Sequence, residues 1–139
     1  MKVLFAADGS DCTRRALDYL ITHDWPGLGS KVSVFTVALP VPHRAAAFAG
    51  PQLVHLYYED DAEQVLRPVR ERLAGSRAEV DYSYVVGHPA QAIVHKAESE
   101  HFDLIVMGSH GHGALANVVL GSVATRVLAT CRIPVLLMR

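Results

Sequence analysis

This sequence of 139 residues contains few cysteines, and its apolar runs are shorter than a membrane span requires. The two cysteines, Cys12 and Cys131, lie far apart and belong to no CxxC or Cys/His pattern, so neither a disulfide framework nor a zinc site is indicated. The apolar stretch before Asp8 has only five residues (VLFAA), too few for the core of a signal peptide or a membrane span. We therefore expect a cytoplasmic protein in a reducing compartment.

An excess of charge of either sign is also missing. Charged residues make up 19% of the chain, and the formal net charge is −1. Proteins that bind nucleic acid or an anionic membrane as their main partner usually carry a clear positive excess, and neither partner is expected here. The length suits one domain over residues 1–139 with a single sizeable core.

What the sequence does contain is a regular alternation of strand and helix patterns. Apolar or β-branched runs alternate with segments that have apolar residues at helical spacing. The expected strands are 2–8, 31–39, 79–86, 102–108 and 133–138. The expected helices are 10–21, 60–75, one that follows Gly87-His88-Pro89 and carries Ile93, Val94 and Ala97, and 122–131. Residues 40–60, rich in proline, glycine and alanine, are expected to form a loop of unassigned role.

This alternation predicts an α/β fold with a five-stranded parallel sheet and helices on both faces. The continuous apolar strands near residues 5 and 106 suit central positions, whereas the alternating strand 79–86 and the strand that follows Pro134 suit edges. The strand order 3-2-1-4-5 follows, as in a doubly wound, Rossmann-like sheet. Ligands of such sheets bind beyond the carboxyl ends of the strands, where the order reverses, here between strands 1 and 4.

Glycines occur at the predicted reversal point with a spacing that suits phosphate. Gly108 and Gly111 allow a sharp turn after strand 4 and expose main-chain N–H groups. Gly121 and Ser122 open the last helix, whose first N–H groups and dipole attract anions. The nine residues between the two pairs are enough to loop out and return, so one polyphosphate can contact both.

Two common phosphate motifs are absent. No GxxxxGK[ST] sequence occurs, and Gly111-x-Gly113 lacks the third glycine of a dinucleotide fingerprint. The chain does contain G-x2-G-x9-G-[ST], formed by Gly108, Gly111, Gly121 and Ser122. With this motif, and with AADGSDCTRRAL, VVGHPAQAIVHKA, DLIVMGSHG and LGSVATRVLATCRIPVLLM, the chain resembles the ATP-binding branch of the universal stress protein family.

The resemblance covers the chain apart from residues 40–60, and it implies a bound ATP with Mg²⁺, a homodimer and a role as a nucleotide-dependent module in the stress response. It places Asp8 near the ribose or a nucleotide-bound Mg²⁺, and Val37 against adenine. His112 departs from the family pattern, since many members have Arg or Lys in this loop. The residues implied to bind the nucleotide are Ala6, Ala7, Asp8, Val37, Met107, Gly108, His110, Gly111, Gly121, Ser122 and Val123.

Several of these residues also have simpler interpretations. Asp8 suits capping of the first helix together with Ser10 as well as it suits ligand contact. His110 and His112 have no Cys or carboxylate neighbour in sequence that would complete a metal site, and Ser122 has no base-bearing motif that would make it a nucleophile. No catalytic residue is therefore assigned, and a slow ATPase or phosphotransferase using the same pocket remains the alternative to a binding module.

The last strand predicts how two copies associate. IPVLLM is apolar, lies at a sheet edge in the expected topology, and is followed only by Arg139. An exposed apolar edge favours pairing with another chain. We expect a homodimer in which Val135, Leu136, Leu137 and Met138 of two copies pair about a two-fold axis.

Overall fold

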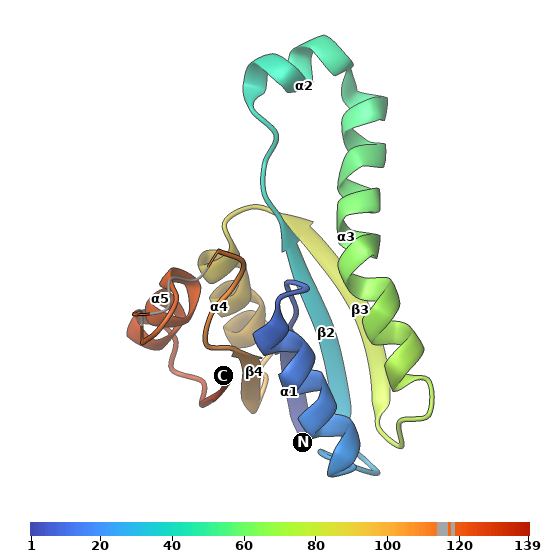
Figure 1. Cartoon of the computed structure of the whole chain (residues 1–139), viewed down its shortest axis with the longest axis vertical. Helices are drawn as coiled ribbons and strands as arrows, with labels where there is room; N and C mark the ends of the chain where they lie inside the picture. The colour runs from blue at the N-terminus through green and yellow to red at the C-terminus, as the bar shows by residue number, and fades with distance from the viewer. Residues whose placement is uncertain (114–116, 118) are drawn as a thin grey trace.

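A computed structural model of the chain describes residues 1–113, 117 and 119–139. Strands and helices alternate along the chain, as expected, with one additional short helix (Figure 1). The elements are β1 (Lys2–Ala6), α1 (Asp11–Thr22), β2 (Lys31–Ala38), α2 (His43–Ala49), α3 (Pro51–Leu73), β3 (Glu79–Val86), α4 (Pro89–Ser99), β4 (Leu104–Gly108), α5 (Ser122–Thr130) and β5 (Val135–Met138).

The five strands form one parallel sheet in the order β3-β2-β1-β4-β5, which confirms the predicted α/β class and strand order. Val3 in β1 pairs with Val32 on one side and with Leu104 on the other. Strands β2 and β3 are therefore added on one side of β1, and β4 and β5 on the other, so the strand order reverses between β1 and β4. A crevice beyond the carboxyl ends of these two strands is the expected consequence.

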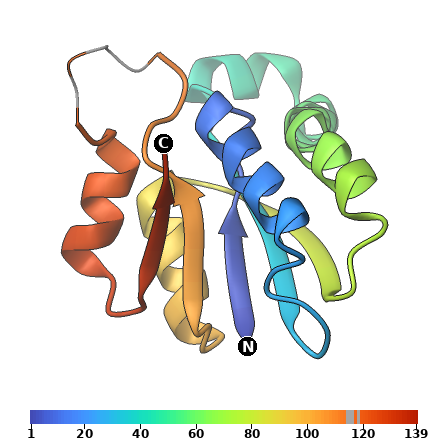
Figure 2. The same ribbon diagram turned by 60° about the horizontal axis from the view of Figure 1, so that its bottom comes forward.

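Side chains of each strand alternate between two cores, one on each face of the sheet. Figure 2 shows α1 and α3 on one face of the sheet and α4 and α5 on the other. Val3 and Phe5 belong to the core on the α1 and α3 side, and Leu4 and Ala6 belong to the core on the α4 and α5 side. Val3, Leu4 and Phe5 are fully buried. Burial on both faces explains why β1 is a continuous apolar run and not an alternating one.

The expectation of a loop over residues 40–60 was wrong. This segment forms α2 and the first turns of α3, which begins at Pro51 and not near Asp60. Gly50 precedes Pro51 with a φ of +86°, and proline at the first helical position costs no hydrogen bond. Although α3 has 23 residues, no helix within the described ranges is long and apolar enough to cross a membrane.

The two edge strands are β3 and β5, as the sequence pattern predicts. The carbonyls of Pro134 and Met138 accept hydrogen bonds from Ile105 and Ser109 on the β4 side. In a parallel ladder, alternate residues direct both backbone groups toward the same neighbour. Val135 and Leu137 consequently direct their N–H and C=O groups toward the open edge of the sheet.

Candidate functional site

A cavity of about 430 Å³ lies beyond the carboxyl ends of β1 and β4, at the reversal point of the sheet. It is bounded by the segments that follow these two strands and by the beginnings of α4 and α5. All eleven residues implied by the sequence line it together: Ala6, Ala7, Asp8, Val37, Met107, Gly108, His110, Gly111, Gly121, Ser122 and Val123.

Gly108, the last residue of β4, is required by close packing. A Cβ atom at this position would lie 2.7 Å from Cβ of Cys12 and 3.2 Å from the backbone N of Thr13. Both neighbours belong to the first turn of α1. The glycine therefore allows α1 to approach the end of β4, in addition to the turn that the sequence pattern predicts.

Gly121 joins the segment after β4 to the start of α5. Its N–H donates to the carbonyl of Ser109 over 2.8 Å, and its own carbonyl accepts from Thr125. A Cβ atom at Gly121 would lie 3.2 Å from the Ser109 carbonyl and 3.3 Å from Cα of His110. The small residue keeps the first turn of α5, whose N–H groups have no acceptors within the helix, beside the segment that follows β4.

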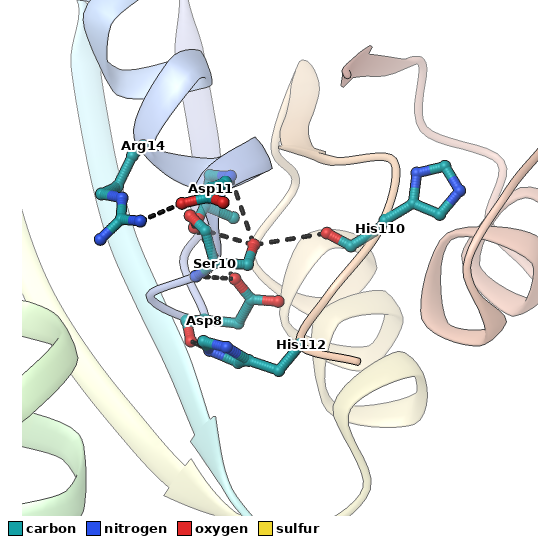
Figure 3. A network of polar contacts seen from close by, with 7 residues as sticks. Asp8, Ser10, Asp11, Arg14, His110 and His112 are labelled. Carbon is teal, nitrogen blue, oxygen red and sulfur yellow. Dashed lines mark hydrogen bonds and ion pairs between the residues drawn. The ribbon is translucent and has the colours of Figure 1, made fainter. Parts of the chain in front are cut away.

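Asp8 has a structural role that leaves part of its carboxylate available (Figure 3). Its Oδ1 accepts hydrogen bonds from the backbone N–H of Ser10 at 2.8 Å and from Oγ1 of Thr13 at 2.9 Å. Ser10, and not Asp8, is the N-cap of α1. The other oxygen, Oδ2, would be 3.0 Å from a Cβ on Gly111, so a side chain at that glycine would crowd the carboxylate.

Two histidines extend from the segment after β4 (Figure 3). Nε2 of His112 lies 2.7 Å from the main-chain oxygen of Asp8. Because a carbonyl only accepts, Nε2 carries the proton in this contact. Nδ1 of His110 lies 2.9 Å from Oγ of Ser109, and its carbonyl accepts from Oγ of Ser10. The contacts of His112 with Asp8 and of Ser10 with the His110 carbonyl join the segments after β1 and β4.

Among the described residues that line the cavity none is lysine or arginine, and Asp8 contributes a carboxylate, so positive potential for an anion comes from main-chain N–H groups and from the start of α5. The nearby carboxyl of Asp11 belongs to the first turn of α1, and its hydrogen bond to Arg14 lowers the pKa of this group. The arrangement can hold an anion through hydrogen bonds and the positive end of the α5 dipole.

The sequence did not indicate several residues of the cavity wall. Phe35 precedes Val37 by two positions on the same strand, so strand periodicity was a usable signal for it. Ile93 and Ala124 carried no signal, because their helical spacing indicates only a core position. The lining residues outside the predicted set are Thr13, Phe35, Pro89, Ile93, Ser109, His112, Gly113 and Ala124.

Comparison with known proteins agrees with this arrangement. The sequence model of the universal stress protein family matches residues 1–139. The chain belongs to the universal stress protein family. Among curated members, a universal stress protein of Thermus aquaticus is 34% identical over 99% of this chain and 97% of its own length, and YxiE of Bacillus subtilis is 30% identical over 99% and 98%. Slr1230 of Synechocystis is 34% identical over 99% of the chain, which spans 42% of the length of that protein.

Solved structures share this fold. The protein MJ0577 is 28% identical, with a TM-score of 0.83 over 99% of this chain and 94% of its own. A universal stress protein in complex with cAMP is 26% identical, with a TM-score of 0.67 over 100% of this chain and 96% of its own. The strand order and the position of the helices are therefore those of the universal stress proteins.

Proposed function

We propose that this universal stress protein binds ATP, with Mg²⁺, in the crevice between β1 and β4 and acts as a nucleotide-dependent regulatory module in the stress response. The observation that carries the proposal is the junction of Gly121 with Ser109, which holds the first turn of α5 against the segment after β4 at one end of the cavity. A helix N-terminus beside a glycine-containing segment is a recurrent site for phosphate groups.

The two ends of the cavity suit the two ends of a nucleotide. Apolar Ala6, Phe35 and Val37 form a wall suited to adenine, while Gly111 and Ser122 supply backbone and hydroxyl groups suited to phosphates. The volume of about 430 Å³ lies within the range of roughly 300 to 1,000 Å³ that is usual for small-molecule sites. A relative that shares 26% identity forms a complex with cAMP, which supports an adenine nucleotide as the ligand.

Asp8 is the residue of this chain suited to the ribose or to a nucleotide-bound Mg²⁺. Its Oδ1 is held by Ser10 and Thr13, so the carboxylate is oriented before a ligand arrives. When bound, Mg²⁺ would offset phosphate charge that the lining side chains do not neutralise. The protein contributes the orientation of the carboxylate and the N–H groups of α5.

The same features favour a binding module over an efficient phosphotransferase. Fast phosphoryl transfer requires strong stabilisation of charge and an oriented nucleophile. The described residues of the cavity wall include no lysine or arginine, and Asp8 is the carboxylate among them that could act as a base. Turnover of ATP at about 1 per second or faster, which is ordinary for enzymes, would contradict the module and support the alternative activity.

ATP is expected to stabilise the folded protein. At about 100 times its dissociation constant, a ligand that binds only the folded state adds roughly 2.7 kcal/mol to the free energy of unfolding. Thermal melting of ligand-free protein with ATP and Mg²⁺ should therefore show a rise of a few degrees or more. GTP should cause a smaller rise, because the wall formed by Val37 and its neighbours is expected to select adenine. An absence of stabilisation by any adenine nucleotide would exclude the proposal.

We also propose that two copies form a homodimer through β5. Val135 and Leu137 direct unpaired backbone groups toward the open edge, and a two-fold-related β5 can complete an antiparallel ladder. Leu137→Lys should weaken this dimer by placing two charges near the axis. Light scattering at matched concentrations measures the mass, and circular dichroism checks that the variant is folded. A folded variant that keeps the wild-type mass would contradict pairing through β5.

A further inference from the structure

The helices that replace the expected loop form a projection, which we call the arm and define as residues 43–61. In Figure 1 the arm stands clear of the sheet, beyond the carboxyl end of β2. Every residue of the arm is exposed or only partly buried, and the first buried residue of α3 is Ala62. From Ala62 onward, α3 packs on the sheet through Leu66, Val69 and Leu73. The arm is thus a helical segment with little support from the rest of the chain.

The outer face of the arm is apolar. Leu53, Leu56 and Tyr57 are 58%, 58% and 55% exposed. At 3.6 residues per turn they lie on the side of α3 opposite to the row that contains Ala62 and Leu66. Phe48 on α2 adds a side chain that is 95% exposed. Several large apolar side chains exposed on one short segment are a feature of surfaces that contact another molecule.

The same face of α3 becomes polar where the helix reaches the body of the protein. The next residues along it are Asp60, Gln64 and Arg67, all exposed. From Asp60 onward this exposed face of α3 is therefore polar, as is usual for a face in contact with solvent. The exposed apolar residues of α3 lie before this point, in the arm. Packing against a partner would bury the apolar side chains that the arm exposes.

The charges of the arm indicate which partner fits. His43 and Arg44 lie in α2 at the tip, whereas Glu59, Asp60 and Asp61 lie at the base. Two arms that pack antiparallel about a two-fold axis would bring the basic tip of each beside the acidic base of the other. The apolar row would then meet its own copy at the centre. In that arrangement the surface would be self-complementary, as a two-fold interface requires.

We propose that the arm is a self-association surface, in which α3 of one copy packs antiparallel on α3 of a second copy. Leu53, Leu56 and Tyr57 form the centre of the contact, and Arg44 of each copy pairs with the acidic base of the other. This interface is separate from the edge of β5. Chains that use both surfaces form assemblies larger than a dimer.

Sedimentation velocity of Leu53→Glu/Leu56→Glu against the wild type tests the proposal. Both positions are exposed and glutamate is a good helix former, so the fold should be preserved. The mass should fall to half or less of the wild-type value, whether or not β5 also pairs. The matched control is Leu28→Glu, which is 76% exposed and lies outside the arm, and it should keep the wild-type mass. An unchanged mass for the double variant, or a wild type that is monomeric at 15.1 kDa, overturns the proposal whatever else the arm binds.

A charge exchange tests the antiparallel arrangement. Arg44→Glu should weaken the arm contact about tenfold, because two attractive pairs become repulsive in a symmetric interface. Adding Asp60→Arg in the same chain should restore the wild-type association, since the exchanged charges again face each other. If Arg44→Glu and Asp60→Arg each weaken the association and the double variant does not restore it, the antiparallel arrangement is overturned.

Discussion

Gly121→Val is expected to abolish nucleotide binding while the sheet remains folded. The backbone of Gly121 has a φ of −70° and a ψ of 164°, which valine adopts readily. Its Cβ, however, would lie 3.2 Å from the Ser109 carbonyl and 3.3 Å from Cα of His110, and the two γ-methyl groups need more space still. The segment after β4 must then move away from α5. Because the proposed phosphate contacts come from both sides of this junction, the binding geometry is lost.

Calorimetric titration with ATP and Mg²⁺ measures this effect, and the stabilisation of roughly 2.7 kcal/mol at high ATP should disappear with it. Gly75→Val serves as the control, since a Cβ at Gly75 would meet no atom within 4 Å. That variant should bind like the wild type. Wild-type affinity in a folded Gly121→Val protein would show that the junction does not hold the phosphates.

Gly108→Ala is expected to destabilise the fold itself, by about 1 to 3 kcal/mol. The new methyl carbon would lie 2.7 Å from Cβ of Cys12 and 3.2 Å from the Thr13 nitrogen, so the first turn of α1 must shift. That turn also positions Thr13, which holds Asp8. The variant should therefore lose nucleotide affinity as well as stability.

Urea unfolding compares the free energies of unfolding of Gly108→Ala and Gly87→Ala. No atom lies within 4 Å of a Cβ at Gly87, and its alanine variant should be as stable as the wild type or slightly more so. Equal free energies of unfolding for the two variants would show that α1 moves aside for the new methyl group without loss of stability. That result would contradict the close packing of α1 on Gly108.

The strand order and the position of the site could be predicted because they follow from patterns that burial imposes. A strand buried on both faces, such as residues 3–6, must be continuously apolar, and an edge strand such as β3 can alternate. Once these strands were ordered, the reversal between β1 and β4 located the crevice. The motif of Gly108, Gly111, Gly121 and Ser122 then fell on its rim, and all its residues line the cavity.

The arm was missed because Gly50, Pro51 and the alanines of α2 resemble a loop composition. Leu53, Leu56 and Tyr57 do have helical spacing, which is a usable signal for a helix whichever way the apolar row faces. The role of Gly108 was only partly visible, since its contact with Cys12 joins positions 96 residues apart. Contacts of this kind depend on how closely α1 packs on β4, which local patterns do not specify.

We propose above that the crevice between β1 and β4 binds an adenine nucleotide. Isothermal titration calorimetry of ATP and Mg²⁺ into protein freed of ligand tests it most directly. We expect saturable binding of one ATP per chain, weaker binding of GTP, and no heat of binding for Gly121→Val. Absence of saturable binding of any adenine nucleotide to the folded wild type would contradict it.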